Sequence, residues 1–377
     1  MDWQFPLFKI YWDKEDTAAV EKAISQGMSW AIGPEIIRFE EKLAEYLGVK
    51  YCLVFNSGTS ALHAVLQAYG IGSGDEVIVP SFTFIATANA PLFVRAKPVF
   101  ADIEDKTNGL DPVDVARKIT PKTKAIIPVH YAGCPCLIGE LKGIARRHNL
   151  LLIEDAAEVL GASINGKKAG TIGDTAILSF CQNKIITTGE GGAAVTNSRD
   201  IYEKMKLVRS HGRLETSDYF TCAENLDYVS LGYNFRMSNL TAALGLAQLN
   251  KVSSIVRMRR KNAQLMTQRL SETPAIITPH PPRGYHHVYQ MYSIRVPQDL
   301  RDGLIDHLSK QGIMSKVFFY PVHLTSFYSK ELKYKDSLPV TEEISRQILS
   351  LPFYPSLTQN EIDFITDQVI RFISESL

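Results

Sequence analysis

The sequence predicts an α/β protein in which helices cover a mainly parallel sheet and a smaller domain follows. Over the first two-thirds of the 377 residues, short apolar runs alternate with helical stretches. These runs are continuously apolar, which is typical of strands buried on both faces of a sheet. A chain of this length also exceeds the usual size of one core, so we expect two domains.

The elements of the first part follow one another as strand and helix. We expect strands at residues 51–56, 76–80, 97–103, 124–131 and 150–155. Helices are expected at residues 57–69, 84–94, 112–119 and 137–148. Two further strands, 176–180 and 193–197, flank a Gly-rich turn at 189–192. This alternation favours a parallel sheet with helices on its faces.

The last third has a different pattern. Residues 239–270 predict one or two long helices, and 304–311 and 359–374 predict two more. Strand-like runs cover 288–296 and 314–320. We therefore predict a large domain at 1–250 and a small α+β domain at 251–377.

Composition excludes several classes of protein. Lys plus Arg is 41 and Asp plus Glu is 40, so no net field attracts nucleic acid or an anionic membrane. The first 16 residues mix charges with aromatics and do not resemble a secretory signal, and no run is long enough to span a bilayer. Five cysteines in so long a chain indicate a reducing compartment, which we take to be the cytoplasm. They are Cys52, Cys134, Cys136, Cys181 and Cys222.

The first strand runs into Ser57, Gly58 and Thr59 before a helix begins. A helix N-terminus offers free N–H groups and a positive dipole end, and a glycine lets a phosphate approach closely. The alternative is that Ser57 or Thr59 caps the helix without a ligand. On this segment alone, capping is the simpler interpretation.

Two further positions carry candidate chemistry. Asp155 ends a predicted buried strand, where open α/β sheets bind ligands, and it could hold a cationic ring nitrogen. Its alternative role is to cap the next segment. Lys184 lies between apolar residues and the Gly-rich turn, where a lysine can form a Schiff base. Its alternative is an ordinary surface lysine beside a hairpin.

Weaker signals favour structural interpretations. His130, Cys134 and Cys136 have a loosely metal-like spacing, but no second cluster completes a tetrahedral site, so we expect no metal. The pair His286 and His287 precedes an apolar strand and is expected at the surface.

Taken in order, these segments resemble the DegT/DnrJ/EryC1/StrS family of nucleotide-sugar aminotransferases over nearly the full chain. The segments that carry the resemblance are residues 56–62, 80–90 (PSFTFIATANA), 97–103, 154–161 (EDAAEVLG), 179–192, 231–249 (LGYNFRMSNLTAALGLAQL) and 320–323 (YPVH). Within that family, NKIITTGEGG together with EDAAE is most similar to GDP-perosamine synthases and related 4-aminotransferases.

The resemblance implies a homodimer of pyridoxal-phosphate fold type I and a role for each matching residue. Lys184 would be the Schiff-base lysine, and Asp155 would pair with the pyridinium nitrogen. Phe84 would stack on the cofactor ring. The phosphate would be held by Ser57, Gly58, Thr59 and Ser179, and by Asn234 of the partner subunit. Tyr320 and His323 would border the sugar pocket.

The position three residues after Asp155 departs from the wider family. Many members carry Gln or His there, near the ring oxygen of the cofactor, whereas this chain has Glu158, as the perosamine branch does. A carboxylate would repel a phenolate-like oxygen unless one of them carries a proton. The role of Glu158 therefore stays open at this point.

The resemblance thus implies transfer of an amino group, with glutamate as donor, to a nucleotide-linked 4-keto-6-deoxy sugar. Such a reaction belongs to deoxyamino-sugar biosynthesis of the O-antigen and lipopolysaccharide type. Two alternatives remain: a pyridoxal-phosphate-dependent sugar dehydratase, whose family members replace the lysine by His, and a non-catalytic nucleotide-sugar binding protein. The nucleotide, the sugar and the aminated carbon are not determined by the sequence.

Overall fold

The computed structural model describes residues 3–214 and 226–377, and a seven-stranded sheet lies at the centre of this part of the chain. The strands lie in the order β1-β9-β8-β5-β4-β2-β3, and β9 is antiparallel to both of its neighbours. The parallel pairs are β8–β5, β5–β4, β4–β2 and β2–β3. The bounds are β1 Tyr51–Phe55, β2 Glu76–Pro80, β3 Lys97–Ala101, β4 Thr123–Ile126, β5 Leu151–Asp155, β8 Thr175–Ser179 and β9 Gly192–Thr196.

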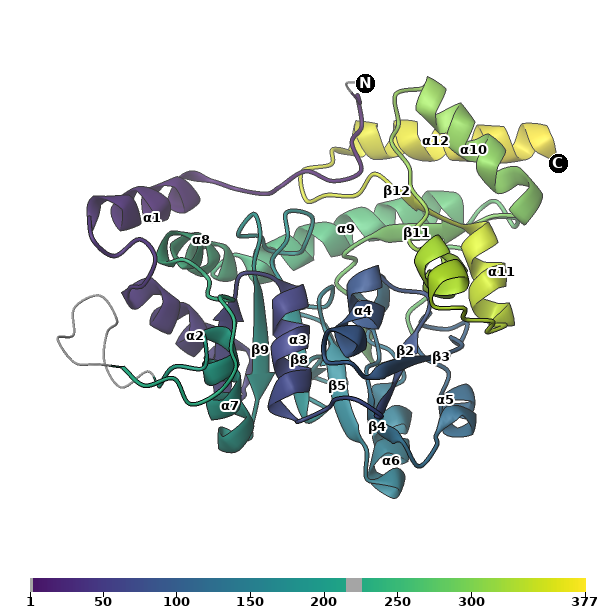
Figure 1. Ribbon diagram of the computed structural model, residues 1–377. Helices are drawn as coiled ribbons and strands as arrows, with labels where there is room; N and C mark the ends of the chain where they lie inside the picture. The colour runs from purple at the N-terminus through teal and green to yellow at the C-terminus, as the bar shows by residue number, and fades with distance from the viewer. Residues whose placement is uncertain (1–2, 215–225) are drawn as a thin grey trace.

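Helices cover both faces of the sheet, as expected (Figure 1). One face packs against α3 (Gly58–Ala68), α4 (Ile85–Phe93) and α7 (Arg199–Arg209). The other packs against α2 (Pro34–Leu47), α5 (Pro112–Lys118), α6 (Ile138–His148) and α8 (Asn239–Leu249). Successive strand residues enter opposite cores: Val54 packs on the α2 side and Phe55 on the α3 side. This is why the strands are continuously apolar.

A second core lies in the last third of the chain. It joins the C-terminal half of α9 (Val252–Leu270) to β11 (Tyr292–Arg295), α10 (Gln298–Lys310), β12 (Ile348–Leu351) and α12 (Gln359–Ser376). The first half of α9 packs instead in the core of the large sheet. Near the N-terminus, Phe5 also packs in the second core, and the following segment runs across the molecule to α1 (Lys14–Ser25) (Figure 1).

Three short strands form a separate small sheet in the order β10-β6-β7. They are β6 (Ser163–Ile164), β7 (Lys167–Lys168) and β10 (Tyr285–His286). The remaining helix, α11 (Pro339–Gln347), leads into β12.

Most predicted elements of the first part agree with the structure within a few residues, but the strand expected at 124–131 ends at Ile126, and several later elements differ. The run 314–320 is not a strand: Lys316 forms a single bridge with Ser350, and Ile313, just before the run, forms one with Phe5. The helix expected at 304–311 begins earlier, at Gln298, and the strand expected at 288–296 is shorter. In the described part of the chain, four α-helices, α1, α2, α7 and α11, have no counterpart among the predicted elements.

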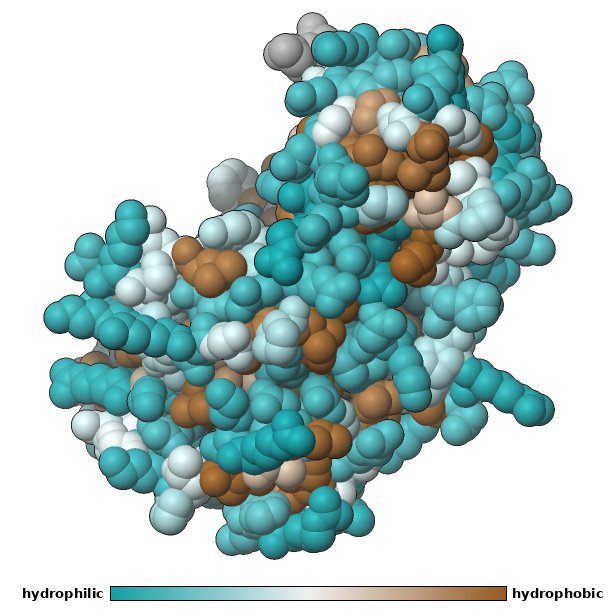
Figure 2. All heavy atoms as spheres, turned by 90° about the vertical axis from the view of Figure 1, so that its right-hand side faces the viewer, coloured by the Kyte–Doolittle hydropathy of each residue, from teal (hydrophilic) through white to brown (hydrophobic). Residues whose placement is uncertain are grey.

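Among the described residues, no helix is both long and apolar enough to cross a membrane. The four described cysteines, Cys52, Cys134, Cys136 and Cys181, are free thiols, and Cys222 lies outside the described residues. Figure 2 shows a mainly hydrophilic face on which apolar residues form separate patches.

The expected surface placement of His286 and His287 is wrong for His287, which is 4% exposed. Its Nδ1 accepts a hydrogen bond from the Tyr289 backbone N–H at 2.8 Å, and its ring stacks on Tyr289 with centroids 3.9 Å apart. Burial, together with the nearby Arg260 and His286, lowers the pKa of His287 to about 3. The imidazole is therefore neutral in the folded protein.

We expect His287 to make the fold sensitive to acid. Because its pKa is about 3 when folded and about 6.5 when unfolded, its contribution to stability is full above pH 6.5 and is lost as the pH falls towards 3. His287→Asn keeps an acceptor for the Tyr289 N–H but cannot titrate. Thermal unfolding measured across this pH range should show a flatter acid slope for His287→Asn than for the wild type. The matched change His286→Asn, at a half-exposed neighbour, should alter the slope less; equal slopes in all three proteins would contradict this account.

Candidate active site

Most of the candidate residues gather at the edge of the sheet where its parallel strands end. Asp155 and Ser179 are the last residues of β5 and β8, and Ser57 and Phe84 follow the ends of β1 and β2. In open α/β sheets this edge is where ligands bind. A cavity of about 550 Å³ opens there, within the usual size of a small-molecule site.

Eight of the eleven candidate residues line this cavity: Ser57, Gly58, Thr59, Phe84, Asp155, Glu158, Ser179 and Lys184. The small domain and the N-terminal segment supply other walls through Leu7, Phe8, Met291, Met314, Lys316, Phe318 and Phe319. The site therefore lies between the two cores of the chain.

The N-terminus of α3 forms one end of the cavity. Ser57 is its N-cap and accepts a hydrogen bond from Ser60 N at 3.0 Å, so the capping interpretation is confirmed. The N–H groups of Gly58 and Thr59 lie in the first turn, where a helix gives them no partner of its own. A Cβ on Gly192 would lie 2.4 Å from Gly58 N, so only glycine lets β9 approach here. With the nearby Ser179 hydroxyl, these groups suit an anion.

Asp155 lies deeper, with 5% of its surface exposed. One carboxylate oxygen accepts from the Thr87 hydroxyl at 2.8 Å, and the other accepts from the Ala157 N–H at 3.2 Å. The bond from the Ala157 N–H is the local capping role given above as the alternative for Asp155. The carboxylate is also part of the cavity lining, so a buried acid faces the cavity. Burial raises the pKa of Asp155, while the bonds from Thr87 and Ala157 oppose that rise.

Glu154, the residue before Asp155, forms a buried pair with His130. His130 Nε2 donates to the Glu154 carboxylate at 2.9 Å, and its Nδ1 accepts from the Cys136 N–H at 3.0 Å. The Glu154 carboxylate also accepts from the backbone N–H groups of Gly170, Ile172 and Gly173. Both ring nitrogens of His130 are thus used in the fold.

Lys184 and Glu158 form an ion pair at the cavity wall. Lys184 Nζ lies 3.1 Å from Glu158 Oε1, and the other oxygen of Glu158 accepts from the Ala132 N–H at 2.8 Å. The lysine side chain is only 15% exposed, so the alternative of an ordinary surface lysine is wrong. The contact places the Glu158 carboxylate beside the amine of Lys184.

The donor set of the cavity fits pyridoxal phosphate. Free N–H groups and hydroxyls at the N-terminus of α3 suit a phosphate. The Phe84 side chain is 61% exposed and offers an aromatic face in the cavity. A buried carboxylate and a primary amine, Asp155 and Lys184, suit the ring nitrogen and the aldehyde.

Three candidate residues lie outside the lining of this cavity: Asn234, Tyr320 and His323. Tyr320 is 61% exposed. His323 is 2% exposed, and its Nδ1 lies 2.6 Å from the Ser81 hydroxyl. Burial lowers the pKa of His323, although the nearby Glu342 carboxylate opposes this shift. Asn234 is exposed, and its backbone oxygen accepts from Asn56 Nδ2 at 3.3 Å. The alternative that the sequence leaves for Asn234, capping of the following helix within its own chain, is wrong, because Ser238 is the N-cap of α8.

Several cavity residues were not among the candidates. Thr87, which binds Asp155, lies in the PSFTFIATANA segment, so its position was a usable signal. Leu7 and Phe8 belong to an N-terminal stretch without helical or strand pattern, and Lys316 belongs to the segment expected as a strand. These three reach the cavity through tertiary contacts, which no local pattern signals.

Comparison with known proteins places this arrangement among aminotransferases. The family model described as the DegT/DnrJ/EryC1/StrS aminotransferase family matches residues 11–370. The GDP-perosamine synthase of Caulobacter vibrioides is 42% identical over 90% of this chain and 91% of its own. That of Vibrio cholerae is 36% identical over 98% and 99%. Among solved structures, Helicobacter pylori PseC, an aminotransferase involved in the biosynthesis of pseudoaminic acid, superposes with a TM-score of 0.93 at 32% identity, covering 98% of this chain and 99% of that one.

Proposed function

The chain belongs to the DegT/DnrJ/EryC1/StrS aminotransferase family, and on that premise we propose that it transfers an amino group from glutamate to a nucleotide-linked 4-keto-6-deoxy sugar. The observation that carries the proposal is one cavity that holds the Lys184–Glu158 pair, the buried Asp155 and the N-terminus of α3. The cofactor is pyridoxal 5′-phosphate. The nucleotide is GDP, by likeness to the perosamine synthases, and the product serves deoxyamino-sugar biosynthesis.

Each residue has a stated task in this proposal. The N–H groups of Gly58 and Thr59 and the hydroxyls of Thr59, Ser57 and Ser179 would hold the phosphate. The Phe84 ring would stack on the pyridine ring of the cofactor. Tyr320, which is 61% exposed, would border the sugar, and the buried His323, held against Ser81, would support that wall of the pocket.

When bound, pyridoxal phosphate supplies an electron sink for the electron pair of a broken C–H bond. The Asp155 carboxylate would keep a proton on the ring nitrogen, because a buried negative charge favours the protonated form of a nearby base. Lys184 Nζ would hold the cofactor covalently between turnovers and move a proton at the substrate carbon. Glu158 would orient that amine through the contact at 3.1 Å.

The presence of Lys184 argues against the dehydratase alternative, since those relatives carry His at this place. The absorbance spectrum of the purified protein distinguishes the enzyme from the non-catalytic alternative, because a nucleotide-sugar binding protein would lack the visible absorbance of lysine-bound cofactor. The free cysteines agree with a reducing compartment, and we propose the cytoplasm.

The function is tested by offering the loaded protein glutamate and a set of keto-sugar nucleotides. The set pairs GDP, UDP and dTDP with 3-keto and 4-keto 6-deoxy sugars. We expect 2-oxoglutarate and an amino sugar, measured by mass spectrometry, with the highest kcat/KM for the GDP-linked 4-keto sugar. No transfer to any member of the set would contradict the proposal.

We also propose that the active unit is a homodimer in which Asn234 completes the phosphate site of the partner subunit. Within the described part of this chain, the Asn234 side chain makes no hydrogen bond, so its amide is available to another group. Asn234→Ala should weaken cofactor binding by roughly 10-fold, as for loss of one hydrogen bond to a charged group.

Mixing subunits distinguishes shared sites from separate ones. If sites are shared, a heterodimer of Asn234→Ala and Lys184→Ala chains has one site with both lesions and one intact site. Turnover, measured at low cofactor concentration, should then exceed that of either parent. If Asn234 acts within its own chain, each site carries one lesion and mixing restores nothing. A fully active monomer would also contradict the shared site.

A further inference from the structure

The loop that carries Lys184 is closed at its base by backbone hydrogen bonds. Phe180 N donates to Gly191 O, and Thr188 N donates to Phe180 O, both at 2.9 Å. Ile185 and Ile186, next to the lysine, are 4% and 1% exposed. These backbone bonds fix only the base of the loop. The position of Lys184 Nζ therefore also depends on the residues that contact the middle of the loop.

Gln248, near the end of α8, contacts the middle of the loop. Its side-chain oxygen accepts from the Thr187 N–H at 3.4 Å. Its side-chain nitrogen donates to Tyr11 O at 3.1 Å and to Asp16 Oδ1 at 3.0 Å. The residue is 2% exposed, so water cannot readily replace these partners. One buried amide thus joins the Lys184 loop to the N-terminal segment and to α1.

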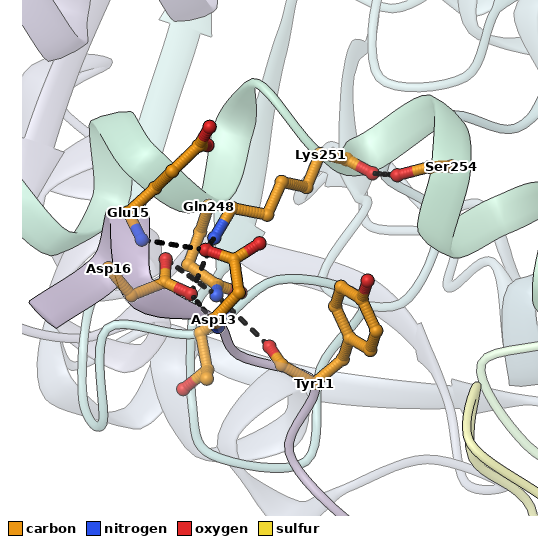
Figure 3. Close-up of polar contacts among 8 residues, drawn as sticks. Tyr11, Asp13, Glu15, Asp16, Gln248, Lys251 and Ser254 are labelled. Atoms are coloured by element: carbon orange, nitrogen blue, oxygen red, sulfur yellow. Dashed lines mark hydrogen bonds and ion pairs between the residues drawn. The ribbon is translucent and has the colours of Figure 1, made fainter.

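Charged groups fix the orientation of this amide (Figure 3). Lys251 Nζ lies 2.6 Å from Asp16 Oδ2 and 2.5 Å from Asp13 Oδ1. Asp16, 4% exposed, therefore turns its other oxygen to Gln248. Burial lowers the pKa of Lys251, but hydrogen bonds to Asp13 and Asp16 outweigh it and the pKa is raised. A charged carboxylate accepts only, so Gln248 must present its nitrogen to Asp16 and its oxygen to Thr187.

The N-terminal segment brings this cluster to the active site. Phe8 and Tyr11 line a narrow gap together with Lys184, Thr187 and Gln248. Phe8 also lines the active-site cavity. Upstream, Phe5 N donates to Gly312 O in the small domain at 3.0 Å. The lysine is thus flanked by the cavity on one side and by this anchored segment on the other.

We propose that Gln248 is a positioning residue: held by Asp16 and Lys251, it fixes the Lys184 loop to the N-terminal segment so that Lys184 Nζ faces Glu158 and the cavity. This inference rests on the proposed role of Lys184. It assigns no contact between Gln248 and substrate.

The test compares two buried amides of the same helix. Gln248→Met keeps the size of the side chain but removes its hydrogen bonds. Asn239→Leu is the matched control: Asn239 is 0% exposed, and its oxygen accepts from Glu35 N at 2.9 Å, away from the Lys184 loop. Gln248→Asn, one methylene shorter, is a second variant that keeps an amide but cannot span the same partners.

Amide hydrogen exchange of residues 182–190 is measured by mass spectrometry in the cofactor-free proteins, and turnover in the loaded ones. In both Gln248 variants we expect exchange of the loop to rise roughly 5–10-fold, as for a lost hydrogen bond. We expect kcat to fall roughly 10-fold with the KM for glutamate little changed, because misplacement of a reacting group slows the reaction rather than binding. The absorbance of lysine-bound cofactor should titrate at a different pH from the wild type. Asn239→Leu should change none of these readouts.

Two results would overturn the inference: loop exchange in the Gln248 variants that matches Asn239→Leu, or an unchanged kcat and titration. The proposed function fails differently. If borohydride attached the cofactor to another lysine while the loop loosened as expected, the anchoring by Gln248 would stand and the role of Lys184 would fall.

Discussion

Lys184→Ala is expected to reduce turnover by at least about 10⁴-fold, the upper range for loss of a group that moves protons in a reaction. In the proposed function this amine both holds the cofactor and moves the proton, and no other described amine lies as close to Glu158. The fold should survive, because the Lys184 side chain contacts Glu158 at the cavity wall while backbone bonds and Gln248 hold the loop. Circular dichroism should therefore match that of the wild type.

The covalent role of Lys184 is measured separately from the rate. Borohydride treatment of the loaded wild type, followed by peptide mapping, should place the cofactor on Lys184. Lys316 is the matched control, since it lines the same cavity and is exposed. Lys316→Ala should keep the label on Lys184. A label on Lys316 or on any other lysine would contradict the assignment.

Asp155→Asn is expected to lower kcat by roughly 10²–10³-fold, the usual effect of removing one pre-organised electrostatic group. A neutral amide cannot hold the proton on the ring nitrogen. The local structure tolerates the change: the amide oxygen can accept from the Ala157 N–H, and the amide nitrogen can donate to the Thr87 hydroxyl, which lies 3.0 Å from Thr83 Oγ1. Cofactor content should fall much less than kcat, because the phosphate contacts at α3 remain.

A second buried aspartate at the same edge of the sheet is the control for Asp155. Asp102 follows β3, and its carboxylate accepts from the backbone N–H groups of Val340 and Thr341 at 3.0 and 2.8 Å, outside the cavity lining. Asp102→Asn should lower stability but leave turnover per folded molecule unchanged. Near-normal turnover of Asp155→Asn, or an equal loss in both variants, would contradict the role of Asp155.

Local pattern was enough to predict the large sheet, whereas most of the candidate site residues came from the resemblance to the aminotransferase family. Residues 52–55 and 77–80 are continuously apolar because β1 and β2 are buried on both faces, so the apolar run can be read within each strand alone. Where those strands end, polar residues follow, and the parallel arrangement brings Ser57, Phe84 and Asp155 to one edge. Residues 314–320 (MSKVFFY) are only partly apolar and form a single bridge, between Lys316 and Ser350, so strand propensity alone was misleading there.

By itself, the sequence determined the fold class and the order of the sheet-forming segments, because periodicity and strand ends are local properties. It singled out Lys184 and Asp155 as the chemical candidates through the resemblance of their segments to the aminotransferase family. The tertiary structure decided which groups meet. Glu158 contacts Lys184, 26 residues away in the sequence, and Gln248 contacts Thr187, 61 residues away. Ser81 contacts His323, 242 residues away. It also decided that His287 is buried and that His323 packs against Ser81 outside the cavity. Such contacts depend on how separate elements pack, and the energy of a buried polar group is set by the partner it meets there.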